Sequence, residues 1–203
     1  MFLLVPALVA GIVALLCGGS LRNLAAVHVR GGLILLSLGV QLAIYLPLLR
    51  RSGLVVHHAE LIYLFAMALA IAGMLRNWRL GVPLRVATLG LIMNATGIAA
   101  NGGHMPVNAA ALHATIGSVA VQTATDPQVY VNTRLATSSS HLLFLSDIIP
   151  VRVPLYHGNV FSAGDVLIAS GVSMLVFGCV RRRSGTRDSC VPRGTAIAPS
   201  GLA

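Results

Sequence analysis

The residues best able to do chemistry in this sequence are its histidines and carboxylates, most of which fall in the stretches 57–60 and 104–165. They are His57, His58, His104, His113, His141, His157, Glu60, Asp126, Asp147 and Asp165. Imidazole and carboxylate groups are ligands for zinc, copper or iron, and imidazole also exchanges protons near neutral pH. No pair of these residues has the i, i+4 spacing that places two metal ligands on one helix face, so we predict no metal site.

A second chemistry open to this region is the binding of a lipid headgroup or a small anion. The turn Asn101-Gly102-Gly103-His104 offers backbone N–H groups to an anionic group, and Arg134 and Arg152 add positive charge. The alternative is that the turn simply requires glycine. The candidate ligand-binding residues of this hypothesis are Asn101, His104, Asn108, His141, Asp147, Arg152 and Asp165.

Several other polar groups have structural explanations. Ser162 and Asp165 have the spacing of a capping box, which favours a structural role for Asp165 over a functional one. The amides of Gln41 and Asn94 lie within apolar segments and are expected to bond between helices. The stretch 138–141 places serines beside a histidine but lacks a nucleophile elbow, and no histidine lies in the middle of an apolar segment, so neither a hydrolase nor a bis-histidine haem protein is favoured. The sequence identifies no cofactor.

The elements that must position these residues are membrane helices. The chain is 56% hydrophobic and 9% charged, with a mean hydropathy of +0.85, which excludes a soluble globular enzyme. The net charge of +9 comes from arginines that lie between apolar blocks, so we predict no nucleic-acid partner. Composition therefore predicts a small multi-pass protein whose partner is the lipid bilayer.

Five apolar segments are candidates for spans, because a hydrocarbon core about 30 Å thick needs roughly 17–25 helical residues. They cover about residues 2–18, 33–49, 59–75, 86–100 and 163–180. We predict an all-α bundle of about five transmembrane helices over residues 1–183, with a disordered cytoplasmic tail over 184–203. Residues 101–162 are predicted to form a re-entrant or interfacial helical loop, with an extended piece at Met105-Pro106-Val107, a helix capped by Asn108 and an apolar stretch ended by Pro150.

The arginines predict the orientation of this bundle. Ten of the fourteen fall on one side of the predicted spans: Arg22, Arg30, Arg76, Arg79, Arg85, Arg181, Arg182, Arg183, Arg187 and Arg193. By the positive-inside rule that side is cytoplasmic, so the amino terminus lies outside the cell membrane and the carboxyl terminus in the cytoplasm. Glu60 is then expected at the outer start of the third span, within reach of His57 and His58.

Three stretches carry a resemblance to a known family. They are Ser20-Leu21-Arg22-Asn23-Leu24, Asn101-Gly102-Gly103-His104-Met105-Pro106-Val107, and Asp147-Ile148-Ile149-Pro150 followed by residues 159–168, and together they extend over most of the chain. The sequence resembles a family of small, uncharacterised bacterial integral membrane proteins, the domain of unknown function 5317. The resemblance implies the architecture and supplies no substrate, cofactor or catalytic residue.

Two functional hypotheses follow, and the sequence leaves open whether the protein is an enzyme. The first is a non-enzymatic subunit or stabiliser of a larger envelope complex, bound to a membrane protein partner or to copies of itself, because few polar groups lie in the spans and many small residues permit packing. The alternative is an enzyme or carrier that binds a lipid or small anion at the outer leaflet through residues 101–165. A small transporter has only Gln41 and Asn94 in its favour.

Overall fold

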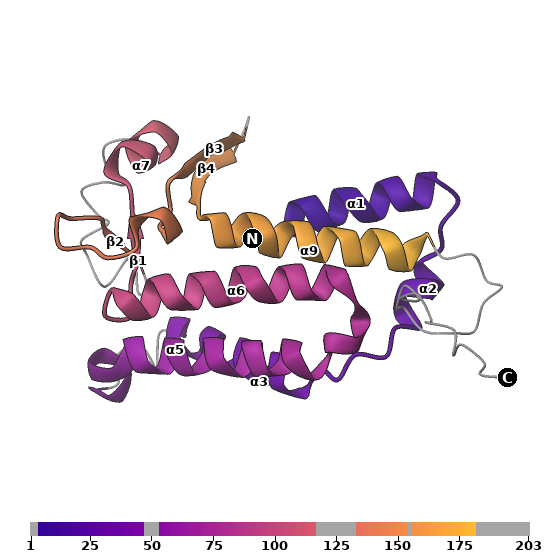
Figure 1. Ribbon diagram of the computed structural model, residues 1–203, viewed down its shortest axis with the longest axis horizontal. Coiled ribbons are helices and arrows are strands. Elements are labelled where there is room, and N and C mark those ends of the chain that lie inside the picture. Colours follow the sequence, from indigo (N-terminus) through magenta and orange to yellow (C-terminus); the bar gives the residue numbers. More distant parts are fainter. Residues whose placement is uncertain (1–3, 47–52, 117–132, 154–155, 182–203) are drawn as a thin grey trace, which may run out of the picture.

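The structure is a computed structural model that describes residues 4–46, 53–116, 133–153 and 156–181. Its longest elements are five helices that lie side by side along a common axis (Figure 1). They are α1 (Leu4–Leu16), α3 (Gly32–Tyr45), α5 (Gly53–Arg76), α6 (Val82–Ala100) and α9 (Ala163–Val180). The helices pack in the order α1, α9, α6, α5, α3, so α6 and α9 form the centre of the bundle.

Three of these helices are long and apolar enough to cross a membrane. The segments His58–Arg76, Val82–Ala100 and Ala163–Val180 have mean hydropathies of 1.7, 1.4 and 1.9. Helices α1 and α3 are also apolar, but they have 13 and 14 residues, or about 20 Å each at 1.5 Å per residue. Among the described residues, the fold is therefore mostly helical with three membrane-capable helices, where the sequence predicted five. The predicted tail, 184–203, lies outside the described residues.

The bundle has two different ends. At one end lie α2 (Leu21–Ala25), the 3-10 turn η1 (Trp78–Leu80) and the carboxyl ends of α5 and α9 (Figure 1). We call this the arginine end, because six arginines of the described residues lie on these elements or beside them: Arg22, Arg30, Arg76, Arg79, Arg85 and Arg181. Buried Asn77 joins two of its segments, since its side chain accepts from Arg30 N at 2.8 Å and donates to Arg30 O at 3.1 Å.

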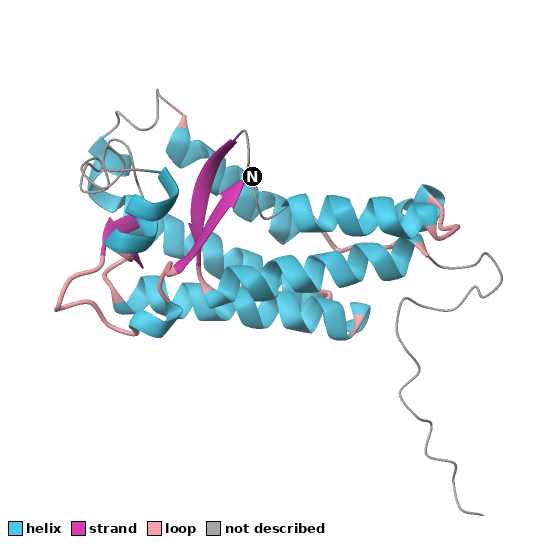
Figure 2. Ribbon diagram, turned by 90° about the horizontal axis from the view of Figure 1, so that it is seen from above, coloured by secondary structure: helices cyan, strands magenta, loops and turns pink. Residues whose placement is uncertain are grey.

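The described residues between 101 and 162 gather at the opposite end and are called the cap here (Figure 2). The cap contains β1 (Met105–Val107), α7 (Ala109–Ile116), β2 (Thr133–Leu135), the 3-10 turn η2 (Leu143–Leu145), β3 (Ile149–Val153) and β4 (Tyr156–Phe161). Strands β1 and β2 pair in parallel, and β3 and β4 form an antiparallel hairpin. The cap is therefore a mixture of strands and short helices.

The strands correct the prediction of a helical loop. The extended piece at Met105–Val107 and the helix capped by Asn108 are confirmed, since Asn108 Oδ1 accepts from Ala111 N at 3.0 Å. The expectation that Pro150 ends its segment was wrong, because Pro150 lies inside β3, opposite Val160. A two-stranded sheet has two edges, so the missing N–H of Pro150 is tolerated there.

Candidate functional site

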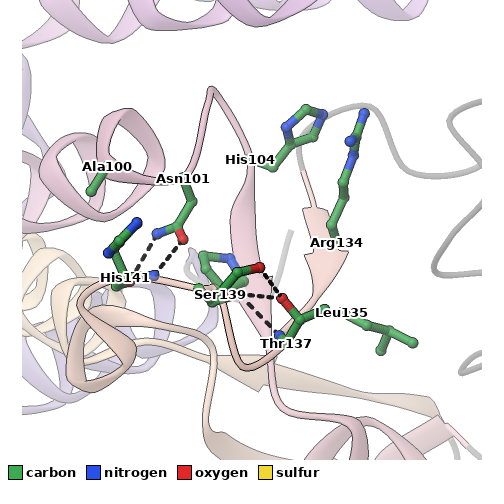
Figure 3. A pocket seen from close by; sticks show the side chains of 10 residues that line it. Ala100, Asn101, His104, Arg134, Leu135, Thr137, Ser139 and His141 are labelled. Atoms are coloured by element: carbon green, nitrogen blue, oxygen red, sulfur yellow. Dashed lines mark hydrogen bonds between the residues drawn. The ribbon is translucent and has the colours of Figure 1, made fainter.

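A pocket of about 400 Å³ lies in the cap, next to the carboxyl end of α6 (Figure 3). Three of the predicted ligand-binding residues line it together: Asn101, His104 and His141. The rest of its polar lining comes from Arg134 and from the hydroxyl groups of Thr137, Ser139 and Ser140. One side of this pocket is thus built from β1 and β2, and the other from the loop that follows β2.

The strand pair places Arg134 and His104 over a carboxylate of α5. Pro106 lies opposite Arg134 in the parallel ladder. Glu60 Oε1 is 3.2 Å from His104 Nε2 and 3.7 Å from an Arg134 Nη atom. Gly103 permits this approach, because it has a φ of 91° and a side chain there would overlap the side chain of Glu60.

His104 and Arg134 differ in charge. Burial lowers the pKa of His104, and the neighbouring Arg134 guanidinium lowers it further, although the Glu60 carboxylate acts in the opposite direction. A lowered pKa keeps the His104 imidazole neutral at pH 7. The guanidinium of Arg134 carries a positive charge, and its side chain is 57% exposed. Arg134 is therefore the fixed positive charge on the pocket wall.

Asn101 holds the backbone of His141 at the opposite wall. Its Oδ1 accepts from His141 N at 2.8 Å, and its Nδ2 donates to His141 O at 2.9 Å and to Gly97 O at 2.8 Å. Figure 3 shows the two residues facing each other. The next residue, Leu142, has a φ of 52°, which a non-glycine residue adopts only when its surroundings require it. The amide of Asn101 therefore positions the His141 side of the pocket.

Replacing Asn101 with alanine should loosen this wall. The variant loses the two hydrogen bonds that tie residue 141 to the end of α6 and the bond to Gly97 O that orients the amide, and the hydrogen-exchange protection of the His141 N–H should fall at least tenfold, since each lost bond is worth roughly 0.5–1.5 kcal/mol. Asn101→Asp keeps the acceptor for His141 N and should lose less protection. Equal protection of the His141 N–H in Asn101→Ala and the parent protein would show that the Asn101 amide does not position residue 141.

The loop between β2 and η2 contributes three hydroxyl groups. Thr137 N donates to Ser140 Oγ at 3.0 Å, and the Thr137 and Ser139 hydroxyls are 2.9 Å apart. These bonds order the loop, and they use only part of the bonding capacity of each hydroxyl, which has one donor and two acceptor positions. Hydroxyl groups beside a guanidinium make a lining that suits an oxyanion such as a phosphate.

Asp165 lies apart from the pocket, in a buried network between α6 and α9. The predicted capping box is confirmed, since Asp165 N donates to Ser162 Oγ at 3.0 Å and Ser162 N donates to Asp165 Oδ2 at 3.2 Å. Asn94 completes the network: its Nδ2 donates to Asp165 Oδ1 at 2.7 Å, and its Oδ1 accepts from Ser162 Oγ at 2.8 Å. The expected interhelical bonding of Asn94 is therefore confirmed.

Among the described residues, Gln41 bonds within its own helix and not, as expected, to another helix. Its Nε2 donates at 3.2 Å to Ser37 Oγ of the same helix, one turn away. The hydroxyl of Ser37 in turn donates to Ala66 O of α5 at 2.7 Å. Ser37 is the buried member of this pair, so the smaller side chain makes the contact between helices.

The remaining predicted ligand-binding residues lie elsewhere in the cap. Asn108 caps α7. Arg152 Nε donates to Ala114 O at 2.5 Å, so this side chain joins β3 to the last turn of α7. Asp147 lies between β1 and the start of α9, and its carboxyl group is largely buried. Burial raises the pKa of Asp147 to about 7, with a further contribution from the charge of Asp165.

The contacts of Glu60 with His104 and Arg134, two residues of the pocket lining, were not predicted from the sequence. Glu60 was expected at a helix start, but α5 begins at Gly53 and places it in the third turn, where it faces His104 and Arg134. The only sequence signal at Glu60 was a carboxylate followed by apolar residues. This signal does not identify His104 and Arg134, its partners 44 and 74 residues further along the chain. In the described part of the chain, no group of three histidine, cysteine or acidic side chains is arranged to hold a metal ion.

Comparison with known proteins gives one match. A family model described as a family of unknown function (DUF5317) matches residues 13–177, a range that includes every pocket residue. No curated protein and no solved structure matches the chain. The family match therefore covers the bundle and the cap together, and it names no ligand.

Proposed function

Because the chain belongs to DUF5317, a family of unknown function, we propose its role from the geometry of the pocket: it is a membrane protein that binds a phosphate-bearing polar ligand in the cap. The observation that carries this proposal is the lining, which includes the guanidinium of Arg134, three hydroxyl groups and a neutral imidazole. This is the lipid or small-anion alternative that the sequence offered, in which Arg134 already supplied positive charge.

The exposed guanidinium of Arg134 favours an anion as the ligand of this pocket. Glu60 contacts one Nη atom of Arg134 at 3.7 Å, which is too long for a hydrogen bond, so among the described residues no hydrogen bond occupies the guanidinium donors that a ligand would use. A guanidinium binds phosphate through paired N–H groups, and hydroxyl donors complete the coordination of the remaining oxygens.

The size of the pocket indicates more than a free ion. Ligand pockets usually have volumes of about 300–1,000 Å³, and this one has about 400 Å³. A phosphate group alone leaves most of that space empty. The chemistry therefore fits an organic phosphate, which is either a phospholipid headgroup or a small soluble phosphate compound.

We also propose that all five long helices cross the membrane, with the cap outside and the arginine end in the cytoplasm. Helices α1 and α3 are short, but they pack along α9 and α5, which are long enough to span. Six of the eight arginines in the described residues lie at the arginine end, and the positive-inside rule assigns that end to the cytoplasm. The pocket then faces the outer leaflet. The other role, a subunit of an envelope complex, stays a prediction that no described contact favours.

Replacing Arg134 with glutamine tests the binding proposal. We expect the parent protein in detergent to bind glycerol 3-phosphate or phosphatidylglycerol, and Arg134→Gln to raise the Kd by about 10- to 100-fold, since a charged hydrogen bond is worth roughly 1.5–3 kcal/mol. Arg152→Gln is the matched control, because Arg152 is an exposed arginine of the same cap whose side chain contacts α7 instead.

The two probes separate the two sources of phosphate. Calorimetric binding of glycerol 3-phosphate identifies a soluble ligand, whereas retention of phosphatidylglycerol over phosphatidylcholine in native mass spectrometry identifies a lipid headgroup. Either result supports the proposal only if it depends on Arg134 and not on Arg152. Binding of neither probe, or equal loss in the two variants, would overturn it.

A further inference from the structure

A second feature of the cap is the way Asp147 fastens it to the bundle. Asp147 N donates to Pro106 O, and Asp147 O accepts from Asn108 N, both at 2.9 Å. The next residue, Ile148, donates its N–H to Phe161 O at 3.1 Å, directly before the first turn of α9. The backbone at Asp147 thus joins β1 to the start of α9.

The half-buried side chain of Asp147 has one oxygen enclosed at this junction. Its Oδ1 is buried and has no hydrogen-bond partner among the described residues, and the same holds for the hydroxyl of Ser146, a residue that is 1% exposed. An ionised carboxylate in such a position loses its hydration and gains no bond in exchange. The geometry therefore favours the neutral carboxylic acid at residue 147.

We propose that the buried carboxyl group of Asp147 carries a proton in the folded protein and that this proton is a latch at the junction between the cap and the start of α9. When the proton passes to water, a buried oxygen without a hydrogen bond shares the negative charge, the charge of Asp165 disfavours it further, and the latch weakens.

Within the described ranges, no cation acts on Asp147 in place of the proton. Asp165 is the charged group of α9 that acts on Asp147, and the residues of α6 and α9 that bond to Asp165, Asn94 and Ser162, are neutral. Strand β1 and the turn η2 consist of apolar residues. The raised pKa of Asp147, about 7, agrees with this arrangement.

The latch also reaches the pocket. Pro106, whose carbonyl accepts from Asp147 N, lines the pocket and lies opposite Arg134 in the ladder. Loss of the proton should therefore loosen one pocket wall. This last consequence rests on the proposed function, whereas the latch itself does not.

Hydrogen exchange measured without any ligand tests the latch. The protection factors of the Asp147 and Asn108 N–H groups, corrected for intrinsic exchange, should fall at least tenfold between pH 6 and pH 8 in the full-length protein. Asp147→Asn, which cannot ionise, should keep the same protection at both pH values. The Leu112 N–H, bonded to Asn108 O inside α7, is the internal reference and should not follow pH.

The outcomes are distinct from those of the ligand test. A tenfold fall that Asp147→Asn removes supports the latch even if no phosphate binds. Protection that is independent of pH in the parent protein, or that falls equally in Asp147→Asn, overturns it. Asp165→Asn should also reduce the fall, because the second carboxylate is then missing.

Discussion

Replacing Gly164 with alanine should destabilise the protein by about 3 kcal/mol, the upper range for inserting a methyl group into a packed core. A Cβ at this position would overlap Asn94 Oδ1 and would lie 2.6 Å from Gly90 O, which is backbone and cannot move aside. The substitution therefore pushes α9 away from α6 and breaks the bonds from Asn94 to Asp165 and Ser162. Thermal unfolding in detergent, followed by circular dichroism, measures the loss.

Gly178→Ala is the control for that experiment. Gly178 lies on the same helix, and a Cβ there meets no atom within 4 Å. This variant should be as stable as the parent protein or more stable by up to about 1 kcal/mol, because alanine is the better helix former. If Gly164→Ala unfolds at the same temperature as Gly178→Ala, close packing of α6 on α9 is not what holds the centre of the bundle together.

Asp147→Asn should stabilise the protein at pH 8 by up to about 4 kcal/mol. The folded chain raises the pKa of Asp147 from 3.8 to about 7, so it binds the proton more tightly than the unfolded chain does. Each pKa unit corresponds to about 1.4 kcal/mol. The sign follows from proton linkage: the carboxyl costs nothing below about pH 4, where both states are protonated, and its cost grows as the pH rises and is complete above about pH 7.

The measurement is a pair of unfolding experiments, at pH 4.5 and pH 8. The parent protein should lose stability between them, and Asp147→Asn should lose less, with the two proteins nearly equal at pH 4.5. Asp188→Asn removes one carboxylate from the stretch beyond the described residues and should keep the slope of the parent. If Asp147→Asn leaves the dependence of the free energy of unfolding on pH unchanged, Asp147 ionises in the folded protein as it does in the unfolded chain.

Local sequence signals predicted the helix ends that depend on local bonds. The span expected at 163–180 matches α9, because Ser162 and Asp165 make a capping box within four residues. The cap of α7 by Asn108 was predicted for the same reason. The start of α5 was predicted six residues too late. Hydropathy marks an apolar segment, whereas this helix extends back from Glu60 through His58 and His57 to Gly53.

Features that depend on distant residues were not predictable in this way. The pairing of β1 with β2 and of Glu60 with Arg134 joins segments separated by more than 25 residues, and neither has a sequence signal of its own. The hairpin β3–β4 was missed because Pro150 suggested an end. Consequently, three of the seven predicted ligand-binding residues meet in the pocket, while the charge that defines it comes from Arg134.

The most direct test of the central claim, an anion site in the cap, is a nuclear magnetic resonance titration of the histidine rings with glycerol 3-phosphate in detergent micelles. His104 and His141 line the pocket, whereas His28 is exposed near the arginine end. We predict that the ring resonances of His104 and His141 shift together and saturate, while those of His28 do not move. Resonances that stay unchanged, or that shift equally at His28, would contradict a phosphate site in this pocket.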